Sequence, residues 1–580
     1  MSIHDDADAK ADAARRAVYD DEFARRDQAA RDELEKARAD ATMLRAALAV
    51  SDGQVGELRE KLSAAQARIA VLEKLLEPPV KPAEPSPGLF FDATPIQEPN
   101  AHTKKSFPHW WPYTIRSWDN AKQERDDWYS KGPTNPASSS YARAAQYGGA
   151  SRSRPMFRAP LPGTTAQWNE TDRRFDIDTA INYGHDGFFF DIIETWKSRG
   201  VDLANALRAA RKENPARYAN FTIIPMIDGN SPTVYTTTSK AGDFLKQFTD
   251  VGHWVDGVFL WAVWHPSTSS NTGGISTWQN IQKYLAGLGV PNKMVGIWNT
   301  AYTNTTNGPA ADGYKDLLYA EGPWGAGTAD PANITATAPS KATEAAGART
   351  RGRVYVNPVR IQETRPDPNQ GPWWDEAANT EAGVAQWSQV IGNKDADWVQ
   401  PVTWSDWTED TAFAPGTHYG YGRLLLSAWF LYRWKTGEYP KILKDTVILS
   451  HRHHRLGAPV TLTTQTITLP QRSNTPRTTA RNKVEARVWL TAPAEIRIID
   501  QSGTTTFQAP AGMSAHTKEL INGAAPRVEV WRYGVKVTEV QSTQPVDPKP
   551  YRHDWTYWMF DNLHSTEFQK RIPGPNPPYA

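Results

Sequence analysis

The chain of 580 residues contains no cysteine. Disulfide bonds, thiolate metal sites and a cysteine nucleophile are therefore all excluded. An excess of charge is also missing, because 65 Lys and Arg residues stand against 64 Asp and Glu residues, a formal net charge of +1. Such a chain has no overall field that attracts nucleic acid or an anionic membrane. We expect a neutral partner, with no nucleic acid and no membrane insertion.

Long apolar runs are missing as well. The first ten residues, MSIHDDADAK, are charged and lack the apolar core of a secretory signal. No run approaches the roughly 20 residues that a membrane-spanning helix needs. An enzyme that acts outside the producing cell would need another exit route, such as lysis or packaging in a particle.

Tryptophan, in contrast, is abundant: the chain has 24 Trp beside 21 Tyr and 18 Phe. An indole offers an apolar face and one N–H donor, which suits sugar rings because these present apolar C–H faces edged with hydroxyls. A large core filled with tryptophan explains the same composition. Composition alone leaves both interpretations open.

Residues 30–76 carry apolar or small side chains in a seven-residue repeat, with charged residues between them and no proline. Positions a and d fall on Leu34, Ala37, Ala41, Leu44, Leu48, Ser51, Val55, Leu58, Leu62, Ala65, Ile69, Leu72 and Leu76. The repeat predicts a left-handed coiled coil between chains, because a lone solvated helix would leave the seam exposed. Gly53 and Gly56 weaken its middle by about 1 kcal/mol each. We assign 1–77 to an α-helical coiled-coil stem of a homo-oligomer, expected to be a trimer by analogy with fibrous stems.

The repeated prolines of EPPVKPAEPSPG end this helix, and 78–104 is expected to be a Pro-rich linker. From 105 to 444, apolar runs alternate with helical stretches. The expected strands are 187–193, 220–228, 257–264, 294–299, 353–359 and 397–404. The expected helices are 201–215, 278–289 and 422–437. This alternation predicts a parallel sheet covered by helices, closed over such a length as a (β/α)8 TIM-like barrel.

After about residue 445 the helical pattern fades. Strand composition occurs at 461–469, 483–490, 494–500 and 527–540. These segments predict an antiparallel β-sandwich over 445–545. The last part, 546–580, is rich in Pro, Tyr and Trp and is expected to be an extension that wraps over a neighbouring surface.

Polar groups follow the expected barrel strands, where the active groups of such barrels lie. They are Asp191, Asp228, Trp264-His265, Asn299 and the dense cluster Trp404-Ser405-Asp406-Trp407-Thr408-Glu409-Asp410. Two carboxylates between tryptophans fit glycoside hydrolysis, in which one carboxyl protonates the leaving oxygen and the other activates water or attacks the anomeric carbon. Asp406 and Glu409 equally fit a capping box at the start of a helix or turn. Both interpretations stay open here.

Four segments resemble glycoside hydrolase family 71, the α-1,3-glucanases or mutanases, especially their actinobacterial and phage-borne relatives. They are SFPHWWPYTIRSWDN (106–120), GHDGFFFDII (184–193), GPWWDEAANTE (371–381) and DWVQPVTWSDWTEDTAFAPGTHYGYGRLLLSAWF (397–430). The resemblance covers about 105 to 455; the last segment is long and specific, and 230–345 matches weakly. It implies a barrel that cleaves α-1,3-glucan.

By this resemblance Asp406 and Glu409 fall on the essential carboxylate pair, and Asp186, with Asp191 beside it, on an acidic motif of the second strand. Inversion of configuration is implied, which needs carboxyls ~6.5–9.5 Å apart. Glu409 as acid and Asp406 as base is our expectation. Ser405 replaces the usual Asn, and Asp410 stands where a small residue is common. A carboxylate at 410 could raise the pKa of Glu409.

Further residues are candidates for substrate binding. His109, Trp110 and Trp111 with Asp119 could contact sugar at a strand end, and a core histidine is the alternative. Glu376 and Asn379 could bind substrate hydroxyls or be surface loop residues, and Asp228 could line the cleft or cap the next turn. Trp404 and Trp407 could flank the substrate. The run HRHH (451–454) lacks the i, i+4 spacing of helix-borne zinc ligands, so no metal and no cofactor is expected.

The sequence therefore predicts an endo-acting, inverting, α-1,3-glucan-like polysaccharide hydrolase of the cell envelope. A signal-less enzyme on a stem, beside a β-sandwich, resembles phage minor tail proteins, so we expect a virion location, contact with other tail proteins and action on the host surface. A second hypothesis is a receptor-binding tail protein that holds glycan in the same cleft without cutting it. A purely structural spike is the third.

Overall fold

The structure, a computed structural model of the chain, divides into two compact units, unit 1 (Met1–Glu84) and unit 2 (Pro85–Ala580). It describes residues 32–45, 61–70, 88–113, 145–149, 153–156, 165–192, 197–229, 237–266, 274–299, 302, 308–325, 328–366 and 371–564. Asp119, expected beside His109, lies outside the described residues.

Unit 1 contains helical residues 32–45 and 61–70. Leu34 and Ala37 of the first segment are buried, and Ile69 of the second packs against them. An ion pair joins Glu33 to Arg68. In one straight helix these two residues would be about 50 Å apart. The expected continuous stem over 30–76 is therefore not confirmed: among the described residues, Leu34 and Ala37 of the heptad seam pack against Ile69 of the same chain.

Unit 2 contains a parallel sheet. In spatial order its strands are β1 (Lys105–Ser106), β12 (Trp398–Pro401), β9 (Val354–Val359), β8 (Leu318–Pro323), β7 (Asn292–Trp298), β6 (Val258–Trp264), β4 (Thr222–Asp228), β3 (Gly187–Ile192) and β2 (His109–Trp110). Each neighbouring pair is parallel. The six strands expected from apolar runs all form, and β8 adds a strand that was not expected.

One segment, 105–110, lies at both edges of this sheet. Its first part pairs with β12 and its second part with β3. Between them, the Phe107 N–H donates to Val399 O (3.0 Å) and the Phe189 N–H donates to Pro108 O (3.0 Å). The sheet therefore curls around on itself, consistent with the expected TIM-like barrel.

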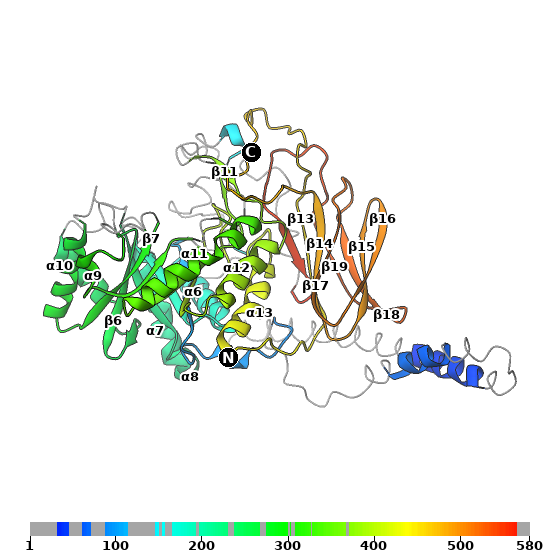
Figure 1. Cartoon of the computed structure of the whole chain (residues 1–580), viewed down its shortest axis with the longest axis horizontal. Coiled ribbons are helices and arrows are strands. Elements are labelled where there is room, and N and C mark those ends of the chain that lie inside the picture. The colour runs from blue at the N-terminus through cyan, green and yellow to red at the C-terminus, as the bar shows by residue number, and fades with distance from the viewer. Residues whose placement is uncertain are drawn as a thin grey trace. The chain divides into compact units, whose positions relative to one another are not determined.

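Helices follow the strands along the chain. They are α6 (Thr165–Asn182), α7 (Lys197–Glu213), α8 (Pro215–Tyr218), α9 (Thr238–Lys246), α10 (Ile275–Gly287), the 3-10 turn η3 (Asp312–Tyr314), α11 (Pro331–Thr350), α12 (Glu381–Gly392) and α13 (Gly422–Thr436). The three expected helices correspond to α7, α10 and α13. Figure 1 shows α9 and α10 beside β6, and α12 and α13 toward the sandwich strands. This alternation of strand and helix is the arrangement predicted from the sequence.

Alternate strand residues face two apolar layers. Phe107, Phe189 and Trp398 belong to the layer inside the barrel. Phe190 belongs to the layer between strands and helices. There α7 approaches β3 so closely that a Cβ on Gly200 would lie 1.8 Å from Cζ of Phe190. Glycine at position 200 is thus required by the packing of α7 on β3.

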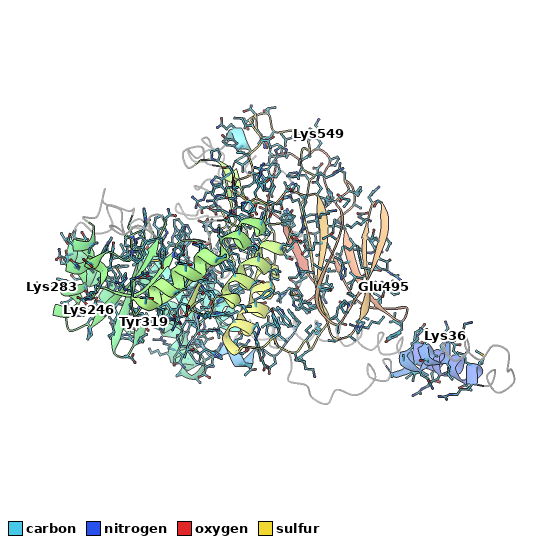
Figure 2. The ribbon with its side chains drawn as sticks, viewed as in Figure 1. Lys36, Lys246, Lys283, Tyr319, Glu495 and Lys549 are labelled. Atoms are coloured by element: carbon cyan, nitrogen blue, oxygen red, sulfur yellow. The ribbon has the colours of Figure 1, made fainter. Side chains whose placement is uncertain are left out.

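The C-terminal part forms two antiparallel four-stranded sheets. One has the order β17 (Gly512–Glu519), β14 (Lys483–Leu490), β13 (Thr446–His451) and β20 (Trp558–Asp561), and the other β16 (Gly503–Ala509), β15 (Ala494–Asp500), β18 (Arg527–Arg532) and β19 (Val535–Gln541). A cluster including Val447, Val488, Ile496 and Val528 packs between them. Figure 2 shows Glu495 of β15 at the opposite end of unit 2 from Lys246 and Lys283. The antiparallel sheets expected from the sequence are present.

In three places the secondary structure or packing near the expected domain boundaries differs from what the sequence predicted. Strand β20 comes from the expected extension, 546–580, and pairs with β13. Residues 461–469 form no strand. Isolated backbone hydrogen bonds, such as that from the Leu462 N–H to Tyr551 O (2.7 Å), join them to the C-terminal segment. The second half of the expected linker is packed into unit 2, where Phe90 is fully buried.

Smaller elements complete the described residues. They are α3 (Thr94–Gln97), η1 (Ala145–Tyr147), β5 (His253–Val255), β10 (Thr364–Arg365) and β11 (Trp373–Trp374). Strand β5 forms a hairpin with β6, and the His253 ring contacts Phe107 and Trp398. This aromatic group fills the amino-terminal end of the barrel.

Candidate active site

The loop after β12 carries the predicted carboxylates and is joined to the end of the first strand segment. The Trp404 N–H donates to His109 O (2.6 Å), and the Ser405 hydroxyl donates to Trp111 O (2.6 Å). Ser405, which departs from the family pattern, thus anchors the loop. These bonds fix the segment that precedes Asp406 at the carboxyl edge of the barrel.

Asp406 caps the turn that follows it. Its Oδ1 accepts hydrogen bonds from Thr408 N (3.1 Å), Thr408 Oγ1 (2.7 Å) and Glu409 N (3.2 Å). Its own N–H donates to Thr403 Oγ1 (2.8 Å), so the reciprocal bond of a full capping box is not made. Burial and then the charge of Glu409 raise the pKa of Asp406 to about 7. Asp406 is therefore both a turn cap and a carboxyl that holds its proton near neutrality.

Glu409 lies in a different environment. Its carboxylate pairs with Arg365 of β10 (2.7 Å) and is 31% exposed. Its carbonyl accepts from the Thr364 N–H (2.9 Å). Arg365 also contacts Glu363 (2.5 Å), a buried carboxylate paired with Arg360. A positive guanidinium held in place by β10 therefore faces Glu409.

Asp410 does not join the pair. It forms an ion pair of 3.0 Å with Arg423 of α13, and both side chains are fully buried. The same guanidinium donates to the carbonyls of Asp410 and Ala412. The additional carboxylate expected to act on Glu409 is thus neutralised by α13.

Three further predicted residues lie at the carboxyl ends of barrel strands. Asp191 and Asp228 are near the ends of β3 and β4, and His109 begins β2. His109 and Asp191 are buried, with 3.6 Å between Nε2 and Oδ2. The structure thus brings His109, Asp191 and Asp228 to the edge that carries the Asp406 loop.

The tryptophans selected from the sequence are core side chains. Trp110 donates from Nε1 to Asp176 Oδ2 (3.0 Å), and its ring lies in the layer between strands and helices. The Trp404 ring belongs to the same layer, 5.1 Å from Phe188. Trp407 is 4% exposed. None of the three rings is an open platform, because all three pack in the layer between strands and helices.

Asp186 lies at the opposite end of the barrel. It precedes β3 and forms a fully buried ion pair of 2.7 Å with Lys435 of α13. The backbone N–H groups of Asn100 (2.7 Å) and Ser106 (2.6 Å) also donate to its carboxylate. These contacts use its charge within the fold, so Asp186 is not brought to the carboxyl edge.

Glu376 and Asn379 lie at the junction with the sandwich, and both are fully buried. Glu376 accepts from the Tyr557 hydroxyl (2.7 Å) and pairs with Arg452 (3.0 Å). Asn379 donates to Ser450 O of β13 (2.9 Å). Both residues join the barrel to the sandwich, and they do not line its mouth.

His451, Arg452 and His454 of the HRHH run are buried, and His453 is partly buried. Burial lowers the pKa of His451 and of His453 to about 4 and that of His454 to about 3. Within the described ranges, no group of three or more His, Cys, Asp or Glu residues could hold a metal ion. The same part of the chain contains no helix of the length and apolarity that crossing a membrane requires.

Sequence reasoning missed Arg365 and Gln400. Arg365 follows the expected strand 353–359 in a segment without a recognisable motif. Gln400 stands in the expected strand 397–404, two residues after Trp398. Strand alternation would therefore have placed the side chains of Trp398 and Gln400 on the same face of that strand. That signal was present in the sequence.

Comparison with known proteins identifies no family: no family model and no curated protein matches. The solved structures to which the chain is similar include glycoside hydrolases. A GH99 endo-alpha-mannosidase from Bacteroides thetaiotaomicron shares 12% identity, with 57% of this chain and 97% of that chain covered and a TM-score of 0.38. A Cellulomonas fimi endo-beta-1,4-mannanase of family 26 shares 12% identity over 61% and 85%, with a TM-score of 0.29. Likenesses this weak establish neither family nor substrate nor mechanism.

Proposed function

We propose that this chain is a glycoside hydrolase whose working carboxyls are Asp406 and Glu409. The observation that carries the proposal is the contrast between them: Asp406 is buried with its pKa raised to about 7, and Glu409 faces the guanidinium of Arg365. Two nearby carboxyls in unlike environments are what an acid and its partner need at neutral pH.

The environments favour Asp406 as the general acid and Glu409 as the base. This assignment reverses the one expected from the sequence. Asp406 delivers its proton to the leaving oxygen, and Glu409, which forms an ion pair with Arg365, takes a proton from the attacking water. Inversion, implied by the family 71 resemblance, needs room for that water between the carboxyls.

The finer parts of the function rest on the sequence. The resemblance of 397–430 to family 71 supports an α-1,3-glucan-like polysaccharide of the cell envelope, cut within the chain. The heptad repeat of 30–76 and the antiparallel sheets of the C-terminal part are the features that support a location on a phage tail, with oligomerisation through unit 1. Multivalent display would raise avidity for a repeating polymer.

The test is hydrolysis of soluble and insoluble glycans, α-1,3-glucan included, by the wild type, Asp406→Asn, Glu409→Gln and the control Glu438→Gln. Glu438 is an exposed carboxylate after α13. We expect the wild type and the control to release oligosaccharides of inverted anomeric form, and each site variant to lose at least about 100-fold in kcat/KM. Equal turnover by all four proteins would rule out this pair.

A second candidate is a glycan-binding protein that does not cut. The three hydrogen bonds to Asp406 Oδ1 favour it, because they give this carboxylate a structural reason to be present. Binding of a glycan by the wild type without release of products from any of the panel would support this candidate.

A further inference from the structure

The interior of the barrel changes from apolar to polar toward the carboxyl edge. Residues two apart in a strand face the same side. Three residues pack inside the barrel, and a polar residue follows each by two positions; the pairs are Phe107 and His109, Phe189 and Asp191, Trp398 and Gln400. These come from 105–110, β3 and β12, which are adjacent in the sheet. The three polar side chains therefore form one layer facing inward, above the apolar layer.

This polar layer is buried and incompletely paired. Gln400 is fully buried, and among the described residues neither its Nε2 nor its Oε1 has a hydrogen-bond partner. His109 Nδ1 and Asp191 Oδ1 likewise have none there. Buried polar atoms without partners are unfavourable, and natural proteins keep few of them. Three such side chains in one layer point to a ligand that completes their bonds.

Indole rings stand beside this layer. Trp324, which follows β8, contacts the His109 ring edge to face at 4.6 Å between centroids. Trp264, at the end of β6, lies 5.7 Å from Trp324. Both are only partly buried, and Trp264 Nε1 has no partner among the described residues. Apolar faces thus border donors and acceptors, which is the surface that a hydroxyl-bearing ring requires.

We propose that Gln400 determines recognition of one sugar ring by binding two adjacent hydroxyls from inside the barrel. Its amide presents a donor and an acceptor side by side, matching neighbouring hydroxyls that each accept and donate. His109 and Asp191 complete the bonds of that ring, and Trp324 covers its apolar face. The inference rests on the proposed function for the identity of the ligand as a glycan.

The inference predicts opposite changes in stability and in binding for one substitution. Gln400→Leu removes two unpaired buried atoms, so the Tm of the free protein rises or stays the same. The matched control is Gln386→Leu, because Gln386 is also fully buried but its Nε2 donates to Thr328 O (3.1 Å), and only its Oε1 lacks a partner among the described residues. The control lowers the Tm and leaves glycan affinity unchanged.

Binding is measured by calorimetry in full-length Glu409→Gln, with an α-1,3-linked glucohexaose and with maltohexaose as probes. We expect Gln400→Leu to weaken binding of whichever probe binds by at least about 10-fold. A lowered Tm, as in the control, or unchanged affinity overturns the inference. If the wild type hydrolyses a glycan and Gln400→Leu hydrolyses it equally well, the inference about Gln400 is overturned and the proposed function is not. If Gln400→Leu loses glycan binding but the wild type hydrolyses no glycan, only the proposed function is overturned.

Discussion

Buried polar residues of the barrel differ between its two ends. At the amino-terminal end Asp186 has Lys435 and two backbone N–H groups as partners. At the carboxyl end Gln400, His109 and Asp191 keep atoms without partners among the described residues. The partners of Asp186 give it a structural role, whereas the unpaired atoms of Gln400, His109 and Asp191 are the ones for which we propose a role in recognition.

The pH dependence of catalysis follows from Asp406. With its pKa raised to about 7, the acid loses its proton above that pH, so kcat/KM should fall on the alkaline side of about pH 7. Arg365 opposes this rise in the pKa of Asp406. Arg365→Met should therefore move the alkaline limb to higher pH, measured as the pH profile of kcat/KM. A limb that does not move would separate Arg365 from the acid.

Breaking the buried ion pair between Asp186 and Lys435, at the amino-terminal end of the barrel, should affect stability and not glycan binding. Asp186→Asn leaves Lys435 buried without its countercharge and should cost about 3–5 kcal/mol of unfolding free energy, measured in urea. The exposed pair Lys536 and Glu539 provides the control, because Glu539→Gln should change stability by under about 1 kcal/mol. Weaker glycan binding at unchanged stability would instead support the substrate role implied by the resemblance.

The helical segments of unit 1 show what periodicity leaves open. Leu34, Ala37 and Ala41 are buried, as their heptad positions predict. The contact of Ile69 with this seam comes from the same chain. A heptad repeat defines an apolar face, but the same face can pack on another chain or on a later part of its own chain.

Because the chain has no natural cysteine, crosslinking can separate these arrangements. In Leu34→Cys with Ile69→Cys, oxidation should form a disulfide within one chain, seen as a monomer band in a non-reducing gel. Each single-cysteine variant is a control. If the apolar seams of different chains do not pack together, each should remain a monomer without a disulfide between chains. A ladder of dimers and trimers from the double variant would favour the interchain stem.

Barrel and sandwich are joined within unit 2 by a buried polar junction. His418, which precedes α13, pairs with Asp554 (3.0 Å), and the Asp554 N–H donates to His454 Nε2 (2.8 Å). The Asp547 N–H donates to His453 O (2.7 Å). The C-terminal segment therefore joins the barrel to the sandwich. This explains why the two form one compact unit, unit 2.

This junction predicts loss of stability in acid. His451, His453 and His454 are neutral in the fold, with pKa values lowered to about 4, 4 and 3, and the unfolded chain protonates them near 6.5. Between these values the unfolded state binds more protons, so stability falls as pH drops below about 6.5. The Tm should decrease from pH 7 to pH 5, and His453→Gln should reduce the decrease. The control Glu438→Gln, at an exposed residue, should not reduce it; an equal effect of both would contradict this origin.

Local patterns predicted much of the architecture. The runs at 187–193 and 353–359 form β3 and β9, because continuous apolar residues fit a strand covered on both sides. The acids Asp406 and Glu409 were found for the same reason: a strand end has a fixed place in such a barrel. Strand β20 could not be foreseen, since its pairing with β13 joins segments far apart in the chain.

By itself the sequence determined where strands and helices form and which acids follow the strands, because periodicity and breakers act over a few residues. Tertiary structure decided what each polar group meets. It placed Lys435, 249 residues away, on Asp186, and Arg365 on Glu409. It also buried the Trp404 ring in the layer between strands and helices. Burial and partners set the charge and role of these groups, and both come from contacts that only the assembled barrel brings together.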